Sequence, residues 1–138
     1  MNTFALKIVT PEGVVYEDDV LEVLLPSTSG QIGILPGHIP LISRLQAGEI
    51  VVKKTGNSAS LAASSGFVEV RPGNQVYVVV DTAERAEHID AARAQAAYER
   101  AQELLKQAQS VEDVEFALVQ AKIEKELARL GVAKKYRP

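Results

Sequence analysis

Acidic and basic side chains recur at helical spacing from position 90 onward. Asp90, Arg93 and Arg100 fall on one face of an expected helix, around the small side chain of Ala97. A carboxylate can accept a hydrogen bond from an amino group such as that of adenine, and a guanidinium can donate two parallel hydrogen bonds to phosphate oxygens. The spacing is therefore compatible with a nucleotide site. It is equally a common pattern for a helix N-cap with a solvated ion pair, and the spacing alone leaves both interpretations open.

These side chains lie in a C-terminal half whose composition differs from that of the N-terminal half. Five of the six prolines and eight of the nine glycines lie at or before Gly73, whereas residues 74–130 contain neither. Turn residues followed by a long stretch of helix formers indicate a strand-rich domain joined to a helical one. We therefore expect a domain over residues 1–84 and a second over residues 85–138.

The N-terminal half contains short apolar or alternating runs between turn signals. Such runs predict an antiparallel β-sandwich or flattened barrel, with its last strand covered on both faces. The expected strands are residues 4–9, 14–16, 20–25, 33–35, 48–53, 60–63, 66–70 and 75–80. The expected core residues are Phe4, Leu6, Ile8, Val20, Val23, Val51, Phe67, Val78 and Val80.

The C-terminal half predicts two helices joined by a short loop. Asp90 can cap the first helix, and Ser110 with Asp113 resembles a capping box for the second, which Gly131 would end. The expected apolar stripes are Ala97, Ala101, Leu104, Leu105 and Ala108 on the first helix, and Phe116, Val119, Ile123, Leu127 and Leu130 on the second. Because these stripes cover little apolar area, we expect the helical hairpin to be held only weakly. The fold class is thus α+β in two parts, an N-terminal antiparallel β-sandwich followed by a C-terminal α-helical hairpin.

Composition and motifs exclude several classes of function. The 138 residues carry a formal net charge of −3, and neither half is basic enough for a nucleic-acid binder. The chain has no cysteine, and its two histidines, His38 and His88, are far apart, so we expect neither a metal site nor catalytic residues. We find no secretion signal and no apolar segment of about eighteen residues, and we expect a cytoplasmic protein that reaches a membrane only through a partner.

A glycine- and proline-rich run carries a family resemblance. Gly30 to Leu41 reads G-x-x-G-x-x-P-G-H-x-P-L, and Leu45 to Gly48 and Ser65 to Val70 follow it. With these segments the chain resembles, over essentially its whole length, the epsilon subunit of a bacterial F-type ATP synthase. The resemblance implies that the sandwich packs on the gamma subunit and the membrane-embedded c-ring, with Gln31, Ile32 and His38 as contact candidates. The same run could also be no more than a crossing between two sheets.

The resemblance also bears on the hairpin. Ile89 to Ala94 is similar to the I/L-D-x-x-R-A motif with which some family members bind ATP. It implies a nucleotide site made of Glu84, Ile89, Asp90, Arg93, Ala94, Arg100, Lys125 and Arg129. Lys125 stands where nucleotide-binding members carry arginine, which keeps the charge but loses the fork. ATP would be a regulatory ligand, and no cofactor would be required.

The function implied by the resemblance is that of a central-stalk subunit. It would be non-catalytic, couple proton flow to ATP synthesis, and inhibit ATP hydrolysis when the hairpin extends toward the alpha/beta catalytic head. Its place would be the cytoplasmic face of the bacterial plasma membrane, as a peripheral component. When the hairpin is extended, the basic tail with Lys134, Lys135 and Arg137 would contact acidic surface on the catalytic head. Two alternatives stay open, a free-standing ATP sensor with a β-sandwich base and a non-enzymatic β-sandwich recognition module.

Overall fold

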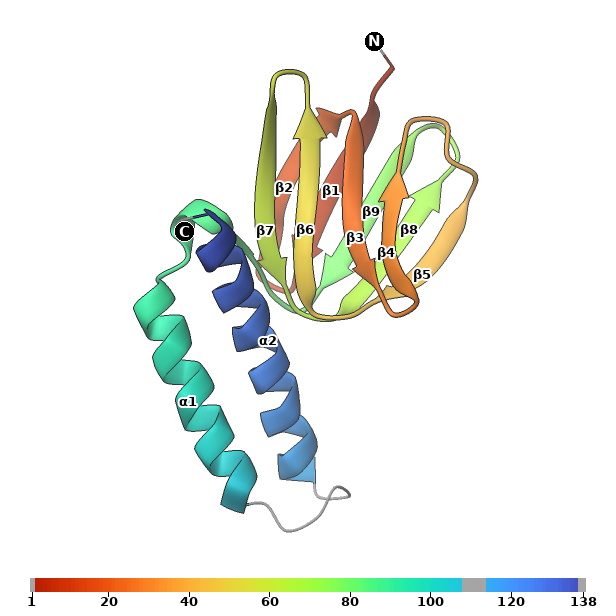
Figure 1. Ribbon diagram of the computed structural model, residues 1–138. Coiled ribbons are helices and arrows are strands. Elements are labelled where there is room, and N and C mark those ends of the chain that lie inside the picture. The colour runs from red at the N-terminus through yellow and green to blue at the C-terminus, as the bar shows by residue number, and fades with distance from the viewer. Residues whose placement is uncertain (1, 108–113, 137–138) are drawn as a thin grey trace.

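The computed structural model describes residues 2–107 and 114–136, and these form a β-domain followed by two helices (Figure 1). The strands are β1 (Phe4–Thr10), β2 (Gly13–Val20), β3 (Glu22–Ser27), β4 (Gly30–Ile34), β5 (Leu41–Leu45), β6 (Gly48–Lys54), β7 (Asn57–Ala63), β8 (Gly66–Arg71), β9 (Gln75–Val80) and β10 (Ala83–Arg85). A 3₁₀ turn, η1 (Ala86–His88), leads into α1 (Ala91–Gln107) and α2 (Val114–Tyr136). This architecture confirms the predicted sandwich and helical hairpin.

The strands form a sheet that folds over on itself. Their order is β10-β7-β6-β3-β5-β8-β9-β1-β2, with β4 paired to β3. The link between β3 and β5 is a single pair, Ser27 opposite Leu45, so the sheet opens there into the two layers of the sandwich. Strand β1 runs parallel to β9, while the other strand pairs found in the described residues are antiparallel. A parallel pair is possible here because β1 and β9 are not joined by a tight turn.

The core lies between the two layers, and most of the predicted core residues are in it. Phe4, Leu6, Ile8, Val20, Val23, Val78 and Val80 are all buried. Two predictions were wrong: Val51 is only half-buried and Phe67 is 52% exposed. Successive strand side chains point to opposite faces, so the buried positions are the neighbours of these two, Val52 and Val68.

The strand assignments need correction at four strands. Strand β9 alternates between buried and exposed residues, with Val79 53% exposed, so it is covered on one face only. Strands β5 and β10 were not predicted, and β4 begins at Gly30, which makes residues 22–34 a β-hairpin. Gly66 allows β8 to approach β9, since a Cβ at this position would lie 2.0 Å from the Val79 carbonyl oxygen.

Helix α2 is longer than the sequence predicted. It continues through Gly131 to Tyr136. Val132 and Ala133, in this last part of the helix, pack against the β-domain, and this packing offsets the cost of one glycine inside the helix. Leu104 and Leu127, expected in the apolar stripes, are 51% and 48% exposed. The predicted capping residues Ser110 and Asp113, and Ala108, lie outside the described residues.

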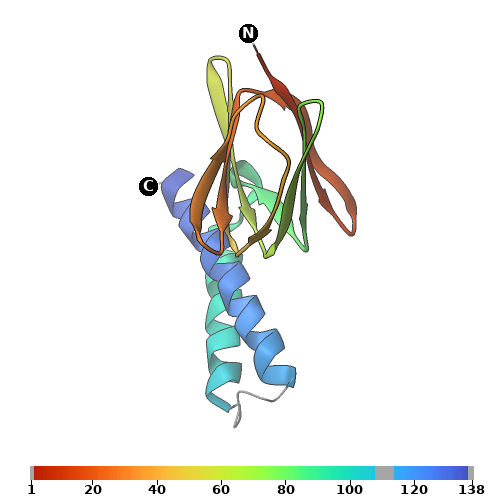
Figure 2. The ribbon, with the colours of Figure 1, turned by 90° about the vertical axis from the view of Figure 1, so that its right-hand side faces the viewer.

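The hairpin touches the sandwich through a small area. Figures 1 and 2 show α1 and α2 projecting beyond one end of the sandwich, with only the C-terminal part of α2 beside β6 and β7. The apolar part of this contact is a cluster of small side chains: Ala62, Ala86, Ile89, Val132 and Ala133. Two ion pairs add to it, Arg129 with Glu84 and Lys135 with Glu49. These side chains join the hairpin to the sandwich in the described residues.

Candidate functional site

Three arginines from two helices line one pocket in the hairpin. Arg93 and Arg100 come from α1 and Arg129 comes from α2, while Ala96 and Ala97 complete the lining. The pocket has a volume of ≈ 470 Å³. Arg93 and Arg100 lie seven residues apart, two helical turns, and the alanines between them leave room that larger side chains would fill. Guanidinium groups around an open pocket form a site for an anion with several oxygens.

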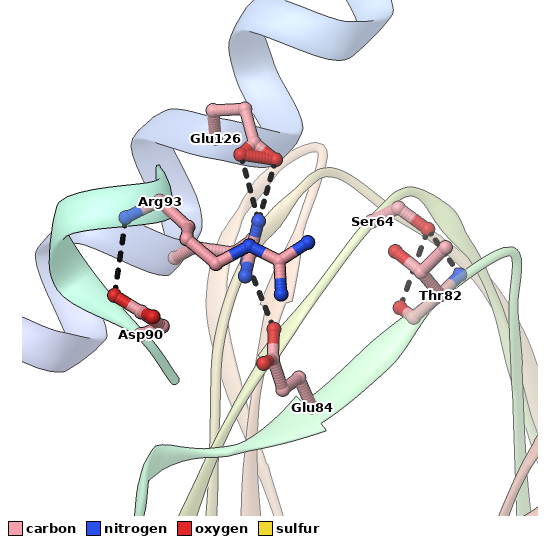
Figure 3. A network of polar contacts seen from close by, with 7 residues as sticks. Ser64, Thr82, Glu84, Asp90, Arg93 and Glu126 are labelled. Atoms are coloured by element: carbon pink, nitrogen blue, oxygen red, sulfur yellow. Dashed lines mark hydrogen bonds and ion pairs between the residues drawn. The ribbon is translucent and has the colours of Figure 1, made fainter. Parts of the chain in front are cut away.

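Arg129 is held in place by two carboxylates, one from each domain (Figure 3). Its Nε donates to Glu84 Oε2 at 2.8 Å, and its Nη1 donates to both carboxylate oxygens of Glu126 at 2.9 Å. Burial by itself would lower the pKa of Arg129, but the hydrogen bonds and charges of Glu126 and Glu84 outweigh it and raise that pKa above its usual value. Arg129 therefore carries a full charge that is already paired.

Arg129 also lines a second pocket. Glu84, Lys125 and Arg129 line it together with residues of β7 and β10, and its volume is ≈ 300 Å³. The segment that carries Glu84 is fixed to the sandwich just before β10. Ser64 Oγ accepts a hydrogen bond from the Thr82 backbone N–H at 2.7 Å (Figure 3). The Ser64 backbone N–H donates to the Thr82 carbonyl oxygen at 2.9 Å. Hydrogen bonds to the sandwich thus hold the segment from which Glu84 contacts Arg129 of the hairpin.

Asp90 is the N-cap of α1. Its Oδ1 accepts a hydrogen bond from the Arg93 backbone N–H at 3.1 Å (Figure 3). Its carbonyl oxygen accepts a hydrogen bond from the Ala94 N–H at 3.0 Å. The Oδ1 bond is to the backbone of Arg93 and not to its guanidinium. One carboxylate oxygen of Asp90 therefore serves as a helix N-cap, which was the alternative to a nucleotide contact. The Asp90 side chain is exposed to solvent at the N-terminus of α1. Ile89 and Ala94 are 2% and 0% exposed and take part in packing.

The structure thus brings the predicted nucleotide residues to one region in different roles. Arg93, Arg100 and Arg129 share a pocket, and Glu84 and Lys125 lie next to it. Sequence reasoning missed Glu126, which is 2% exposed and bonded to Arg129. The i,i+3 spacing of Glu126 and Arg129 indicates that they can pair on one helix face, but it does not indicate that Glu126 is buried.

The residues predicted to contact partners lie at the β3–β4 hairpin and just after it. Gln31 and Ile32 belong to β4, where Gln31 is exposed and Ile32 packs partly against the core. His38 follows in the connection to β5, and its Nδ1 donates to the Ile39 carbonyl oxygen at 2.6 Å. Ile39 itself is 74% exposed and Ile42, on β5, is 70% exposed. This region therefore presents apolar side chains to solvent.

No helix among the described residues has the length and apolar character needed to cross a membrane. The same residues, 2–107 and 114–136, contain no group of three histidine or carboxylate side chains placed to hold a metal ion.

Comparisons with known proteins cover both domains. A family model described as the beta-sandwich domain of the ATP synthase delta/epsilon chain matches residues 3–86, and that of its long alpha-helix domain matches residues 87–134. The ATP synthase epsilon chain of Bacillus subtilis is 49% identical over 76% of this chain and 79% of its own length. That of Caldanaerobacter subterraneus is 44% identical over 98% of this chain and 96% of its own.

Solved structures share the fold at much lower identity. A chain in the Euglena gracilis mitochondrial ATP synthase, a structure described as OSCP/F1/c-ring in rotational state 1, matches with a TM-score of 0.78 and 20% identity. The match covers 97% of this chain and 82% of that one. Family models, relatives and fold agree, and the chain belongs to the ATP synthase delta/epsilon family, among its bacterial epsilon chains.

Proposed function

We propose that this chain is a non-catalytic regulatory subunit in the central stalk of a bacterial ATP synthase, and that its hairpin responds to ATP. The observation that carries the proposal is the pocket in which Arg93, Arg100 and Arg129 converge from two helices. A ligand with several phosphate oxygens can bind all three at once and so hold the two helices together. Bound ATP would therefore favour the folded hairpin.

The residues around the pocket divide the work of binding. Arg93 and Arg100 can form charge-assisted hydrogen bonds to phosphate oxygens, and Lys125 adds a point charge from the neighbouring pocket. Ala97 leaves space along α1 for the ligand. The second carboxylate oxygen of Asp90 can accept from the adenine amino group at the N-terminus of the helix. Buried Ile89 and Ala94 place this end of α1 against the sandwich and α2.

The weak contact between hairpin and sandwich supports a switch. Its apolar part has five side chains, three of them alanine, so its contribution to stability is on the order of a few kcal/mol. A ligand that binds only the folded hairpin, present at a free concentration of a hundred times its Kd, stabilises the folded form by about 2.7 kcal/mol. Such a ligand can shift the population between folded and extended hairpins. The extended form would reach the alpha/beta catalytic head and inhibit ATP hydrolysis, with Lys134 and Lys135 meeting acidic surface there.

The sandwich would provide attachment. The β3–β4 hairpin and the segment after it, with Gln31, Ile32 and His38, would dock on the gamma subunit and on the c-ring. The Euglena assembly includes the F1 sector and the c-ring, and the likeness to one of its chains supports this placement by fold alone. Proton flow through the c-ring would then be coupled to rotation of the stalk. The subunit would lie at the cytoplasmic face of the plasma membrane without entering it.

Calorimetric titration of the isolated chain with ATP tests the ligand. We expect saturable binding, at least tenfold weaker binding for Arg93→Ala, and no change for Arg71→Ala, which removes an exposed arginine from β8 in the sandwich. Loss of two charge-assisted hydrogen bonds would account for a tenfold change. No saturable heat into the millimolar range would refute the ATP part of the proposal.

The hydrolysis rate of the assembled enzyme tests regulation. Removal of residues 88–138 should raise the rate at low ATP and leave the sandwich attached. An unchanged rate at every nucleotide concentration would refute inhibition by the hairpin. Co-purification with gamma and the c-ring tests attachment, and a chain that bound ATP but neither partner would instead be a free-standing sensor.

A further inference from the structure

Glu126 is a buried carboxylate beside the proposed nucleotide pocket. Its side chain is 2% exposed, although it lies on a helix whose neighbouring residues Glu124 and Leu127 face solvent. Both of its oxygens accept from Arg129 Nη1 at 2.9 Å. Burying a carboxylate is costly unless it is paired, so Glu126 in its charged form depends on Arg129 at this buried position.

The pairing restricts what Arg129 can offer to a ligand. A guanidinium binds an oxyanion in parallel through two adjacent N–H groups, either along the Nε edge or across the two Nη nitrogens. Glu84 accepts from Nε and Glu126 accepts from Nη1, so each of these edges is partly taken. A phosphate can form a two-bond contact with Arg129 only if it displaces one of the carboxylates.

We propose that Glu126 is an internal competitor for the phosphate groups of the nucleotide, and that it sets the affinity of the pocket. The inference rests on the proposed function, because it concerns the same pocket. In the ligand-free hairpin the Glu126 carboxylate accepts hydrogen bonds from Arg129 N–H groups that a phosphate would need. Binding requires Arg129 to exchange this carboxylate for phosphate oxygens, and the free energy of that exchange is subtracted from the affinity.

Glu126 differs from Glu84 in two ways that matter for this role. Glu84 lies on β10 in the sandwich and its side chain is 32% exposed, so water can replace its partner at little cost. Glu126 lies on the same helix as Arg129, one turn away, and moves with it. The competition from Glu126 therefore persists when the hairpin leaves the sandwich, whereas that from Glu84 ends.

Substitution of Glu126 by glutamine tests the proposal. Glu126→Gln keeps the size and one acceptor oxygen but removes the charge, and we expect it to bind ATP about tenfold more tightly than the wild type does. Inorganic tripolyphosphate, used as a second probe, should show the same gain because the competition concerns phosphate alone. Glu124→Gln makes the same charge change on the solvent-facing side of α2 and should alter either affinity less than twofold.

The outcomes separate this inference from the proposed function. If the wild type binds ATP and Glu126→Gln binds it equally well or more weakly, the competitor role is wrong and the nucleotide site stands. If neither binds ATP, the nucleotide site is wrong and the competitor role falls with it. Binding of ATP by Glu126→Gln alone supports the competitor role, but the lack of binding by the wild type still refutes regulation of the native hairpin by ATP. Equal gains in Glu126→Gln and Glu124→Gln would reduce the effect to net charge and contradict the proposal.

A measurement on the wild type avoids any loss of folding in the variants. The Glu126 side-chain carboxylate carbon should change its NMR chemical shift when the protein is saturated with ATP, because its hydrogen bonds from Arg129 are exchanged. The Glu124 carboxylate carbon serves as the reference. An unchanged Glu126 resonance at saturation would show that Arg129 keeps its partner, and would overturn the proposal.

Discussion

Replacement of Arg129 by methionine should destabilise the hairpin by leaving a buried carboxylate without its partner. Arg129 and Glu126 are 19% and 2% exposed in their side chains, and three hydrogen bonds of 2.8–2.9 Å join Arg129 to Glu126 and Glu84. Methionine preserves much of the aliphatic length but none of the donors. The variant therefore isolates the loss of charge pairing from the loss of packing.

The size of the effect follows from burial. Removing one member of a buried ion pair costs about 3–5 kcal/mol, chiefly because the other charge stays buried. Glu84 is 32% exposed and can be solvated, so only Glu126 contributes fully. We therefore expect Arg129→Met to lower the free energy of unfolding by about 3 kcal/mol. Arg100→Met, at an exposed position of α1, should change it by less than about 0.5 kcal/mol.

A double-mutant cycle separates the pair from its surroundings. Urea unfolding followed by circular dichroism at 222 nm reports mainly the helices, and the double variant Arg129→Met with Glu126→Leu removes both charges. An apolar pair of similar volume should restore stability to within about 1 kcal/mol of the wild type. The reasoning is refuted if Arg129→Met unfolds like the wild type, or if the double variant is as unstable as the single one.

Further predictions concern other parts of the chain. Gly66→Ala should lower the free energy of unfolding by at least about 2 kcal/mol, since its Cβ would overlap the β9 backbone; Gly131→Ala, which meets no atom within 4 Å, should raise it by about 0.5–1 kcal/mol, and the reverse order would contradict the packing described. Asp90→Ala should lower it by about 1 kcal/mol through loss of the N-cap, measurable by urea unfolding, with an unchanged midpoint counting against that role. The hydrogen bond from Lys54 lowers the pKa of Asp18 below its ordinary value, so stability from this pair is present above about pH 4 and is lost as the pH falls through the folded-state pKa. Asp18→Asn should therefore lose less stability than the wild type below about pH 4, and parallel acid-unfolding curves would refute this.

The sequence predicted the two-part architecture because composition changes abruptly after Gly73. Turn residues and helix formers act locally, so their distribution reveals where strands give way to helices. Which face of a strand is buried depends on pairing across the sandwich, and this is why Phe67 and Val51 were assigned to the wrong side. Gly131 was expected to end α2 by its intrinsic preference, but contacts of Val132 and Ala133 with the sandwich continue the helix.

The candidate site, too, was predicted only where local spacing along the chain determines it. Spacing along one helix placed Arg93 and Arg100 on a common face, and the family resemblance added Glu84, Lys125 and Arg129. The convergence of α1 with α2 depends on how the hairpin closes, which local spacing does not determine. The burial of Glu126 depends on the same packing and could not be seen from an i,i+3 pattern that is common on exposed helices.

The distance between a probe on the sandwich and one on the hairpin tests the central claim most directly. The chain has no cysteine, so Thr55→Cys, in the turn between β6 and β7 and outside the proposed docking segment, and Glu124→Cys on α2 allow a spin label to be attached at each of two exposed positions. The labelled chain would be assembled into an enzyme whose other subunits carry no reactive cysteine. We predict one distance distribution at saturating ATP, matching the folded hairpin, and a second, different distribution when ATP is removed. A single distribution, identical with and without ATP, would contradict the account.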